Sequence, residues 1–207
     1  MILSAIMIVE VSLNYNDLCS ALYRREKRVM LKMKNESKKI RADIKLLVLD
    51  VDGVLTDGSL TINADGTESK SFSALDGHGI RLWRRAGLKV AFLSGRFSEP
   101  TKQRAAQLEI DFCFQNCHNK LEVIEKLIEQ LDITAENIAY VGDDLMDLPV
   151  LKYVGFAVSV ENAVDETKHA ADYITQKQGG AGAVREVIEY ILKNTGKWEP
   201  LMQRYIN

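Results

Sequence analysis

The sequence predicts an α/β fold in which helices flank a parallel β-sheet. Short apolar runs typical of strands alternate with longer amphipathic segments from residue 46 to residue 192. The run Leu46-Leu-Val-Leu49 shows no polar alternation, which is typical of a strand buried on both faces. Carboxylates and small polar residues directly follow several of these runs, at the edge of a parallel sheet where ligands bind.

Composition narrows the protein class. The 207 residues are enough for one α/β domain and an extension, and 46% of them are apolar. A formal net charge of −2 argues against a nucleic-acid partner. Three cysteines are too few for a disulfide scaffold, so a reducing cytoplasm is the expected compartment. No apolar run is as long as a membrane span, and no membrane insertion is expected.

Residues 1–42 differ from the rest and are expected to form a basic N-terminal extension, helical or disordered. Residues 17–33 have the pattern of an amphipathic basic helix, which fits either a membrane surface or a solvated helix. Residues 46–207 carry 17 Lys/Arg and 24 Asp/Glu, so the expected folded domain, residues 43–207, is acidic.

A β-hairpin is expected over about residues 58–72. The dipeptide Asp65-Gly66 lies between two short runs rich in β-branched residues, which is a strong hairpin signal. The hairpin interrupts the strand–helix alternation and should project from the edge of the sheet. Its apolar residues Leu60, Ile62 and Phe72 have no local cover, so a partner subunit is expected to bury them.

The remaining elements follow in regular alternation. Strands are expected at 89–93, 112–114, 138–141, 155–158 and 172–175, and helices at about 79–86, 98–108, 119–131, 146–152, 163–169 and 184–192. Residues 195–207 are expected to form a C-terminal tail. The predicted architecture is therefore Rossmann-like. The segment between Asp50 and Ser94 is too short to hold an inserted cap domain.

Polar residues whose side chains could act in catalysis or binding follow the predicted strands. Asp50 and Asp52 come after the first strand, Ser94 after the second, and Asp143 after the fourth, while Lys120 lies near a helix start. In an extended strand, Asp50 and Asp52 would project to the same side, and a hard divalent cation would offset their repulsion. Each residue alone also fits an ordinary turn or surface position, but together they fit a phosphate site.

In this order the residues resemble the haloacid dehalogenase superfamily of phosphohydrolases. The matching motifs are Asp50-Val-Asp-Gly-Val54, Ser94, Lys120 and Gly142-Asp-Asp-x-x-Asp147. Over about residues 44 to 195, these motifs with the hairpin and Gly179-Gly-x-Gly-Ala-Val-Arg-Glu186 look like the 3-deoxy-D-manno-octulosonate 8-phosphate phosphatase family. The resemblance implies a cap-less, magnesium-dependent homotetramer whose hairpins help roof neighbouring active sites. It also implies a role in lipopolysaccharide precursor synthesis.

The resemblance assigns the central reaction to two carboxylates. Asp50 would attack phosphorus and form an aspartyl-phosphate, and Asp52 would act as general acid and then general base. Mg²⁺ would be held by the side chains of Asp50 and Asp143 and by the backbone carbonyl of Asp52.

Four further residues are expected to support this reaction. Ser94 and Lys120 would stabilise charge on the transferring oxygens. Asp144 and Asp147 are expected in the outer shell, where they order water or Lys120.

Substrate recognition is expected from residues beside the catalytic groups. Arg96 can bind the carboxylate of a sugar acid with two parallel hydrogen bonds, although a structural salt bridge is the alternative. Thr56, Gly95 and Arg104 are further substrate-binding candidates, and Lys70 is another cation near the site. Rival hypotheses are a phosphatase for a related nine-carbon sugar acid phosphate and a non-catalytic oligomerisation module with the same fold.

Overall fold

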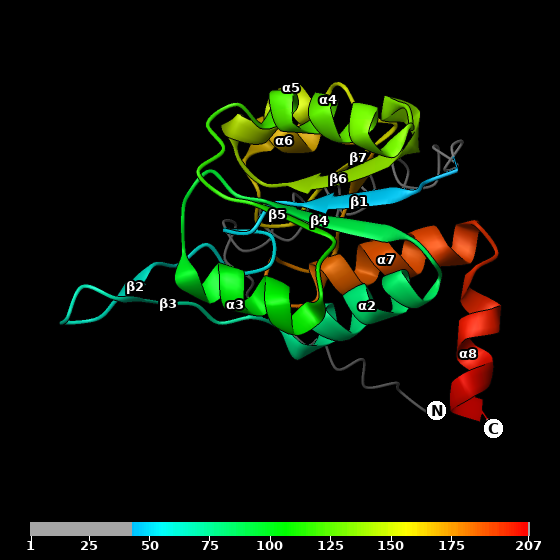
Figure 1. The fold of residues 1–207 in the computed structure, drawn as a ribbon, viewed down its shortest axis with the longest axis horizontal. Helices are drawn as coiled ribbons and strands as arrows, with labels where there is room; N and C mark the ends of the chain where they lie inside the picture. Colours follow the sequence, from blue (N-terminus) through cyan, green and yellow to red (C-terminus); the bar gives the residue numbers. More distant parts are fainter. Residues whose placement is uncertain (1–42, 207) are drawn as a thin grey trace, which may run out of the picture. The chain divides into compact units, whose positions relative to one another are not determined.

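The computed structural model describes residues 43–206, which form one parallel six-stranded sheet with helices on both faces (Figure 1). The strand order is β5-β4-β1-β6-β7-β8, and every pairing in this sheet is parallel. The strands are β1 (Leu46–Leu49), β4 (Lys89–Leu93), β5 (Phe112–Phe114), β6 (Ile138–Gly142), β7 (Phe156–Ser159) and β8 (Tyr173–Ile174). The predicted fold class is confirmed. The predictions for residues 1–42 lie outside the described residues.

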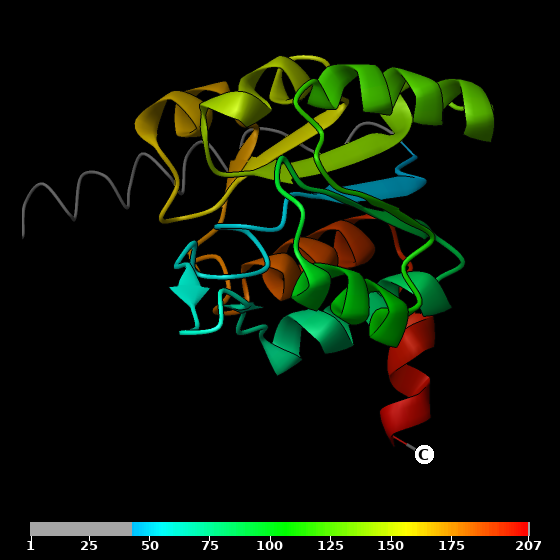
Figure 2. The ribbon, with the colours of Figure 1, turned by 60° about the vertical axis from the view of Figure 1, so that its left-hand side comes forward.

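The helices form two layers, which Figures 1 and 2 show above and below the sheet. One layer contains α2 (Ala74–Arg85), α3 (Glu99–Leu108) and α7 (Ala183–Asn194). The other contains α4 (Lys120–Leu131), α5 (Leu148–Leu151) and α6 (Asp165–Ala170). Short 3₁₀ turns, η1 (Ala135–Asn137) and η2 (Leu145–Asp147), precede β6 and α5.

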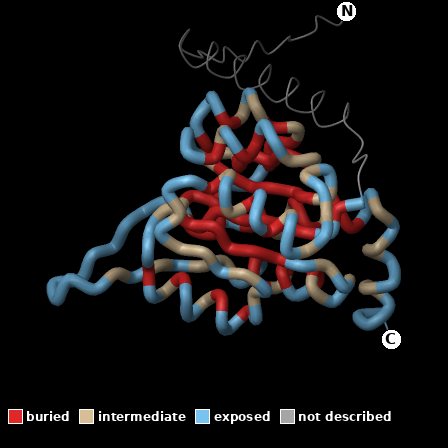
Figure 3. Tube along the Cα trace, turned by 45° about the horizontal axis from the view of Figure 1, so that its top comes forward, coloured by how far each residue is buried: buried red, intermediate tan, exposed pale blue. Residues whose placement is uncertain are grey.

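Strand β1 is the centre of the molecule. All four of its residues are completely buried, because Leu47 and Leu49 pack into the core under α2 and α7 while Leu46 and Val48 pack into the core under α4 and α5. Figure 3 shows the same burial along the central strands. Since β4 lies on one side of β1 and β6 on the other, the chain reverses its direction of winding at β1. This is the switch point at which open α/β sheets bind ligands.

The predicted hairpin is present but short. Strands β2 (Thr61–Ile62) and β3 (Glu68–Ser69) pair antiparallel, and the turn is closed by a 2.8 Å hydrogen bond from Asn63 N to Thr67 O. The hairpin projects from the carboxyl edge of the sheet (Figure 2). Leu60 and Ile62 are 53% and 61% exposed. Phe72 packs against the core of its own chain, so the expectation that it lacks local cover is wrong.

Helix α2 begins five residues earlier than the predicted start at Gly79. Ser73 caps it, because its hydroxyl accepts a hydrogen bond from Asp76 N. Gly77 and Gly79 weaken the helical pattern in the sequence, but both are buried. A Cβ at Gly79 would lie 3.1 Å from the Cα of Arg185 on α7, so glycine permits this close approach of the two helices.

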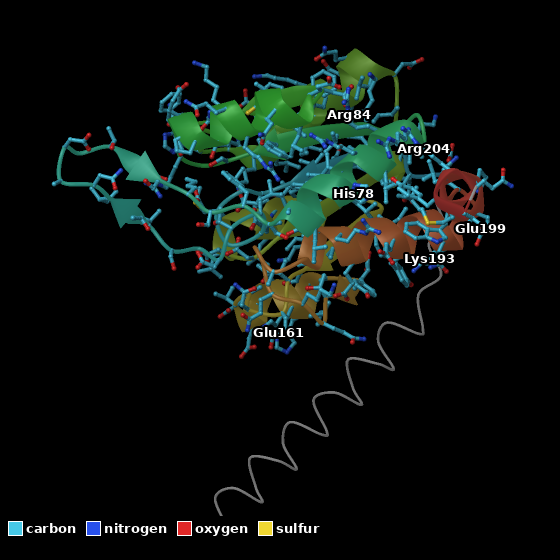
Figure 4. All side chains as sticks on the ribbon, turned by 90° about the horizontal axis from the view of Figure 1, so that it is seen from below. His78, Arg84, Glu161, Lys193, Glu199 and Arg204 are labelled. Carbon is cyan, nitrogen blue, oxygen red and sulfur yellow. The ribbon has the colours of Figure 1, made fainter. Side chains whose placement is uncertain are left out.

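A further helix, α8 (Trp198–Ile206), replaces most of the expected C-terminal tail. Its residues Trp198, Leu201 and Met202 pack against the core on the α2 and α7 side. The Tyr205 hydroxyl accepts a 2.8 Å hydrogen bond from Arg85 on α2. Figure 4 looks onto this side of the molecule. These tertiary contacts stabilise a helix too short to form alone. No helix within residues 43–206 is long and apolar enough to cross a membrane.

A buried carboxylate joins α2 to the loop before α7. Asp76 is 1% exposed and accepts hydrogen bonds from Gly182 N at 3.2 Å and Arg185 N at 2.8 Å, so it caps α7 from another helix. The loop that it fixes lies against the turn after β1, because a Cβ at Gly179 would lie 1.7 Å from Gly53 O.

We predict that Asp76→Ala lowers the free energy of unfolding by about 1–3 kcal/mol, because it leaves two buried amides without an acceptor. Urea unfolding at fixed protein concentration, followed by circular dichroism, measures the change. Glu125→Ala on the exposed side of α4 is the control and should change stability by less than about 0.5 kcal/mol. Equal stabilities of the two variants would contradict this account of Asp76.

Candidate active site

Four of the predicted site residues, Asp50, Lys120, Asp143 and Asp147, meet at the carboxyl edge of the sheet, beside the switch point. Asp50 follows β1, Asp143 follows β6, and Lys120 is the first residue of α4. Lys120 Nζ lies 3.0 Å from Asp50 Oδ1, and carboxylate oxygens of Asp50, Asp143 and Asp147 all lie within 4.8 Å of one another. The prediction that parallel strand ends gather these groups is therefore confirmed for this cluster, which we call the acidic cluster.

Lys120 is held inside the acidic cluster by two carboxylates. It is 4% exposed, and its ammonium also donates to Asp147 Oδ1 at 2.7 Å. Burial works against the charged ammonium, but Asp50 and Asp147 outweigh that effect and raise the pKa of Lys120. Lys120 therefore keeps its positive charge beside the predicted nucleophile.

Asp147 is the completely buried carboxylate of the acidic cluster. Its Oδ2 accepts hydrogen bonds from the backbone amides of Asp143 and Asp144, at 2.8 and 3.1 Å. This close approach requires glycine at residue 142, where a Cβ would lie 2.6 Å from the Asp147 carboxyl. Because both of its oxygens already accept hydrogen bonds, Asp147 is better suited to orient Lys120 than to bind a metal.

Asp143 is the group that a cation would satisfy. Its Oδ1 is buried and accepts no hydrogen bond from the described residues. Burial, followed by the charges of Asp50 and Asp147, raises the pKa of Asp143 to about 8, and burial raises that of Asp50 to about 6 despite Lys120. A buried carboxylate oxygen without a donor, next to a second carboxylate, fits a hard divalent cation. Asp50 and Asp143 are the side chains suited to hold it.

The turn after β1 brings Asp143 close to the backbone. Gly53 has a φ of +84°, and a Cβ at this position would lie 1.9 Å from Asp143 Oδ2. Thr56 supports the turn, since its hydroxyl accepts hydrogen bonds from Gly53 N and Gly58 N. Thr56 was predicted to bind substrate, but it is 2% exposed and its hydroxyl is engaged in the turn.

Asp52 is not part of an extended strand. Strand β1 ends at Leu49 and residue 52 lies in a turn, so the expectation that an extended strand carries both Asp50 and Asp52 is wrong. Asp52 instead forms an ion pair with Lys70, a hairpin residue whose side chain is only 1% exposed. Lys70 also lies 3.3 Å from Glu68 Oε1.

The hairpin continues this chain of charges to Arg96, which donates to Glu68 Oε2 at 3.0 Å. The salt bridge considered as an alternative for Arg96 is thus present, while its side chain remains 44% exposed. Ser94, in the same loop, is 2% exposed and exchanges hydrogen bonds with the backbone of Arg96 at 3.0 and 3.2 Å. Gly95 leaves room for Met146, whose Cε would lie 3.3 Å from an added Cβ.

Arg104 lies on another surface. Its guanidinium donates to Ser73 O at 3.2 Å and to Gln107 at 2.6 Å, and it stacks over Phe72 with 5.7 Å to the ring centroid. Burial, then the nearby Arg81, lowers its pKa. Within residues 43–206, no contact joins Arg104 to the acidic cluster, so its predicted role in substrate binding would need a neighbouring subunit.

Two residues that contribute to the site, Tyr140 and Glu68, were not among those predicted from the sequence. Tyr140 on β6 donates a 2.6 Å hydrogen bond to Asp147, but in the sequence it stands within a strand-like apolar run. Glu68, which joins Lys70 to Arg96, looks in the sequence like one charge of a solvated hairpin. A tyrosine shortly before Gly142-Asp143 was the one usable signal, because a buried tyrosine hydroxyl needs a partner.

The chain is similar to known phosphatases over most of its length. A family model described as haloacid dehalogenase-like hydrolase matches residues 112–188. The chain is 44% identical over 155 residues to 3-deoxy-D-manno-octulosonate 8-phosphate phosphatase KdsC of Escherichia coli (strain K12). This alignment covers 75% of this chain and 82% of that protein. The protein of the same name from Yersinia pestis is 40% identical over 158 residues, covering 76% and 84%.

Solved structures agree in fold. The 3-deoxy-D-manno-octulosonate 8-phosphate phosphatase of Moraxella catarrhalis, in complex with magnesium ion, phosphate ion and a KDO molecule, matches with a TM-score of 0.78 and 38% identity over 84% of this chain and 99% of that one. The cobalt-bound phosphatase of the same substrate from Haemophilus influenzae matches with a TM-score of 0.74 and 41% identity, covering 77% and 93%.

We predict that a divalent cation stabilises the chelator-treated protein through Asp143. At about 100 times its Kd, MgCl₂ should add about 2.7 kcal/mol, which corresponds to about 5–10 °C in Tm for a chain of this size. Asp143→Asn should reduce the shift to less than about 2 °C, because it replaces a charged oxygen ligand with an amide. Differential scanning fluorimetry measures both, and Asp165→Asn, an exposed acid on α6, is the control. Equal shifts in all three proteins would place the cation elsewhere.

Proposed function

The chain belongs to the 3-deoxy-D-manno-octulosonate 8-phosphate phosphatase family of haloacid dehalogenase-like hydrolases, and from this premise we propose that it hydrolyses 3-deoxy-D-manno-octulosonate 8-phosphate to the free sugar acid and phosphate. It is a sugar phosphoric monoester hydrolase. The observation that carries the proposal is the 3.0 Å contact between Lys120 Nζ and Asp50 Oδ1 inside the acidic cluster. This arrangement places a cation beside a carboxylate at the end of the central strand, where a phosphate can approach both.

Asp50 is the nucleophile in this proposal. One of its carboxylate oxygens attacks phosphorus, the bond between phosphorus and the sugar oxygen breaks, and an aspartyl-phosphate forms. Water then attacks the same phosphorus, the bond to Asp50 breaks, and inorganic phosphate leaves. Val51 N donates to Asp50 Oδ1 at 2.7 Å and fixes the orientation of the carboxylate.

Asp52 carries the proton in both steps. It donates a proton to the departing sugar oxygen, and it then removes a proton from the attacking water. Its carboxylate pairs with Lys70, so the hairpin fixes the orientation of the proposed acid/base group.

The charge on the transferring phosphoryl group is shared among several donors. Lys120 and the Ser94 hydroxyl bind its oxygens. We propose Mg²⁺ as the cation, held by the carboxylates of Asp50 and Asp143 and by the backbone carbonyl of Asp52. When bound, it supplies positive charge that neutralises the phosphoryl oxygens. Asp144 and Asp147 remain in the outer shell.

Arg96 is the proposed partner of the substrate carboxylate. Its partly exposed guanidinium lies beside the phosphate loop and carries one ion pair, to Glu68, so donors remain for a second carboxylate. Gly95 and Thr56 shape the same edge of the site. Arg104 would contribute from a neighbouring subunit.

We further propose a homotetramer in a reducing cytoplasm. Large apolar side chains are exposed on the hairpin and around the carboxyl edge of the sheet, namely Leu60, Ile62, Leu75, Phe97, Leu145 and Met146. A second copy of the chain that covered these residues would also roof the open active site, which has no cap domain of its own.

The proposal predicts Mg²⁺-dependent phosphate release with a preference for the eight-carbon sugar acid. Colorimetric phosphate assays should give the highest kcat/KM with 3-deoxy-D-manno-octulosonate 8-phosphate, lower values with a nine-carbon sugar acid phosphate, and the lowest with glucose 6-phosphate, which lacks the carboxylate. Asp50→Asn should reduce kcat by at least about 10³-fold, since the amide cannot form the covalent intermediate.

Asp132→Asn is the matched control, because Asp132 is an exposed residue at the end of α4 with a φ of +49° that asparagine also adopts. It should keep wild-type activity. Absence of phosphate release from every sugar acid phosphate in the presence of Mg²⁺ would refute the proposal, and a preference for the nine-carbon substrate would overturn its substrate assignment.

A further inference from the structure

Tyr140 is a tyrosine in the centre of the sheet with a hydroxyl that reaches the active site. It lies on β6, is completely buried, and packs into the core under α4 and α5. Its neighbours in that core include Val48, Leu93 and Ile124. A phenylalanine would fill the same space, so packing alone does not account for a hydroxyl here.

Among the described residues, the hydroxyl has one hydrogen bond, to the carboxylate that holds Lys120. It donates to Asp147 Oδ1 at 2.6 Å, and the same oxygen accepts from Lys120 Nζ at 2.7 Å. Burial, followed by the charge of Asp147, raises the pKa of Tyr140 well above its usual value. The hydroxyl therefore remains a donor.

Asp147 is fixed from both sides. Backbone amides of Asp143 and Asp144 hold Oδ2, while Tyr140 and Lys120 share Oδ1. Without the hydroxyl, Lys120 would be the one side-chain donor to Oδ1 among these contacts. The ammonium could then turn further toward Asp147 and away from Asp50 Oδ1, which now lies 3.0 Å from it.

We propose that Tyr140 is a positioning residue for phosphoryl transfer, which acts through Asp147 to keep the Lys120 ammonium between Asp147 and Asp50. This inference rests on the proposed phosphatase function. It extends the site to Tyr140, a core residue on β6 that contacts Asp147 and acts through it. A network of this kind affects the rate because a small displacement of a charged donor weakens its stabilisation of the transition state.

The test compares two tyrosine-to-phenylalanine variants. Tyr140→Phe should lower kcat by about 10-fold and change KM by less than about 3-fold, because the lost interaction acts in the transition state. Tyr173→Phe is the matched control, since Tyr173 is 7% exposed and also donates to a carboxylate, Glu186 Oε1, at 2.8 Å. It should keep kcat within about 2-fold of wild type. Thermal unfolding verifies that both variants are folded at the assay temperature.

A double-mutant cycle with Asp147→Ala separates positioning from a general effect on the core. If Tyr140 acts through Asp147, the loss caused by Tyr140→Phe should shrink to less than about 2-fold when Asp147 is already absent. Unchanged kcat in folded Tyr140→Phe, an equal loss in Tyr173→Phe, or fully additive losses in the cycle would each overturn the inference. An inactive wild type would instead refute the proposed function, so the two failures are distinct.

Discussion

Repulsion among carboxylates at one edge of the sheet is the constraint on which the site depends. Asp50 and Asp143 follow adjacent strands, and burial raises the pKa of both. The charge of Asp147 raises both further, and the charge of Asp50 adds to the rise at Asp143. Lys120 compensates part of this charge, and it is held by Asp147. The negative charge that Lys120 does not compensate includes that of Asp143, whose buried Oδ1 accepts no hydrogen bond from the described residues. A divalent cation would satisfy that oxygen, so the proposed metal binding and the arrangement of the proposed catalytic groups have the same physical origin.

The hairpin has two functions in this account. It presents apolar residues to solvent, and it also supplies Lys70, which pairs with Asp52, and Glu68, which joins Lys70 to Arg96. Asp52, the proposed acid/base residue, and Arg96, the proposed carboxylate-binding residue, are therefore both linked by charge to the hairpin. Because the Lys70 side chain is almost fully buried, its removal would leave Asp52 without this compensating cation, while Glu68 would keep its ion pair with Arg96.

The sequence predicts the sheet and the location of the site well, because buried parallel strands lack polar alternation and end directly at the reactive residues. It predicts side-chain contacts less well. Strand β1 ends at Leu49, before both aspartates, and no local pattern indicates the pairing of Asp52 with Lys70. Helix α8 and the first turn of α2 depend on tertiary contacts, which compensate for weak or interrupted helical patterns.

The central claim is that a carboxylate at the end of the central strand becomes phosphorylated inside the acidic cluster. A crystal structure with Mg²⁺ and beryllofluoride, which mimics an aspartyl-phosphate, tests this claim most directly. The account predicts beryllium bound to a carboxylate oxygen of Asp50, with Lys120 on its fluorides and the metal beside Asp143. An adduct on any other residue, or an empty site under conditions where the enzyme is active, would contradict it.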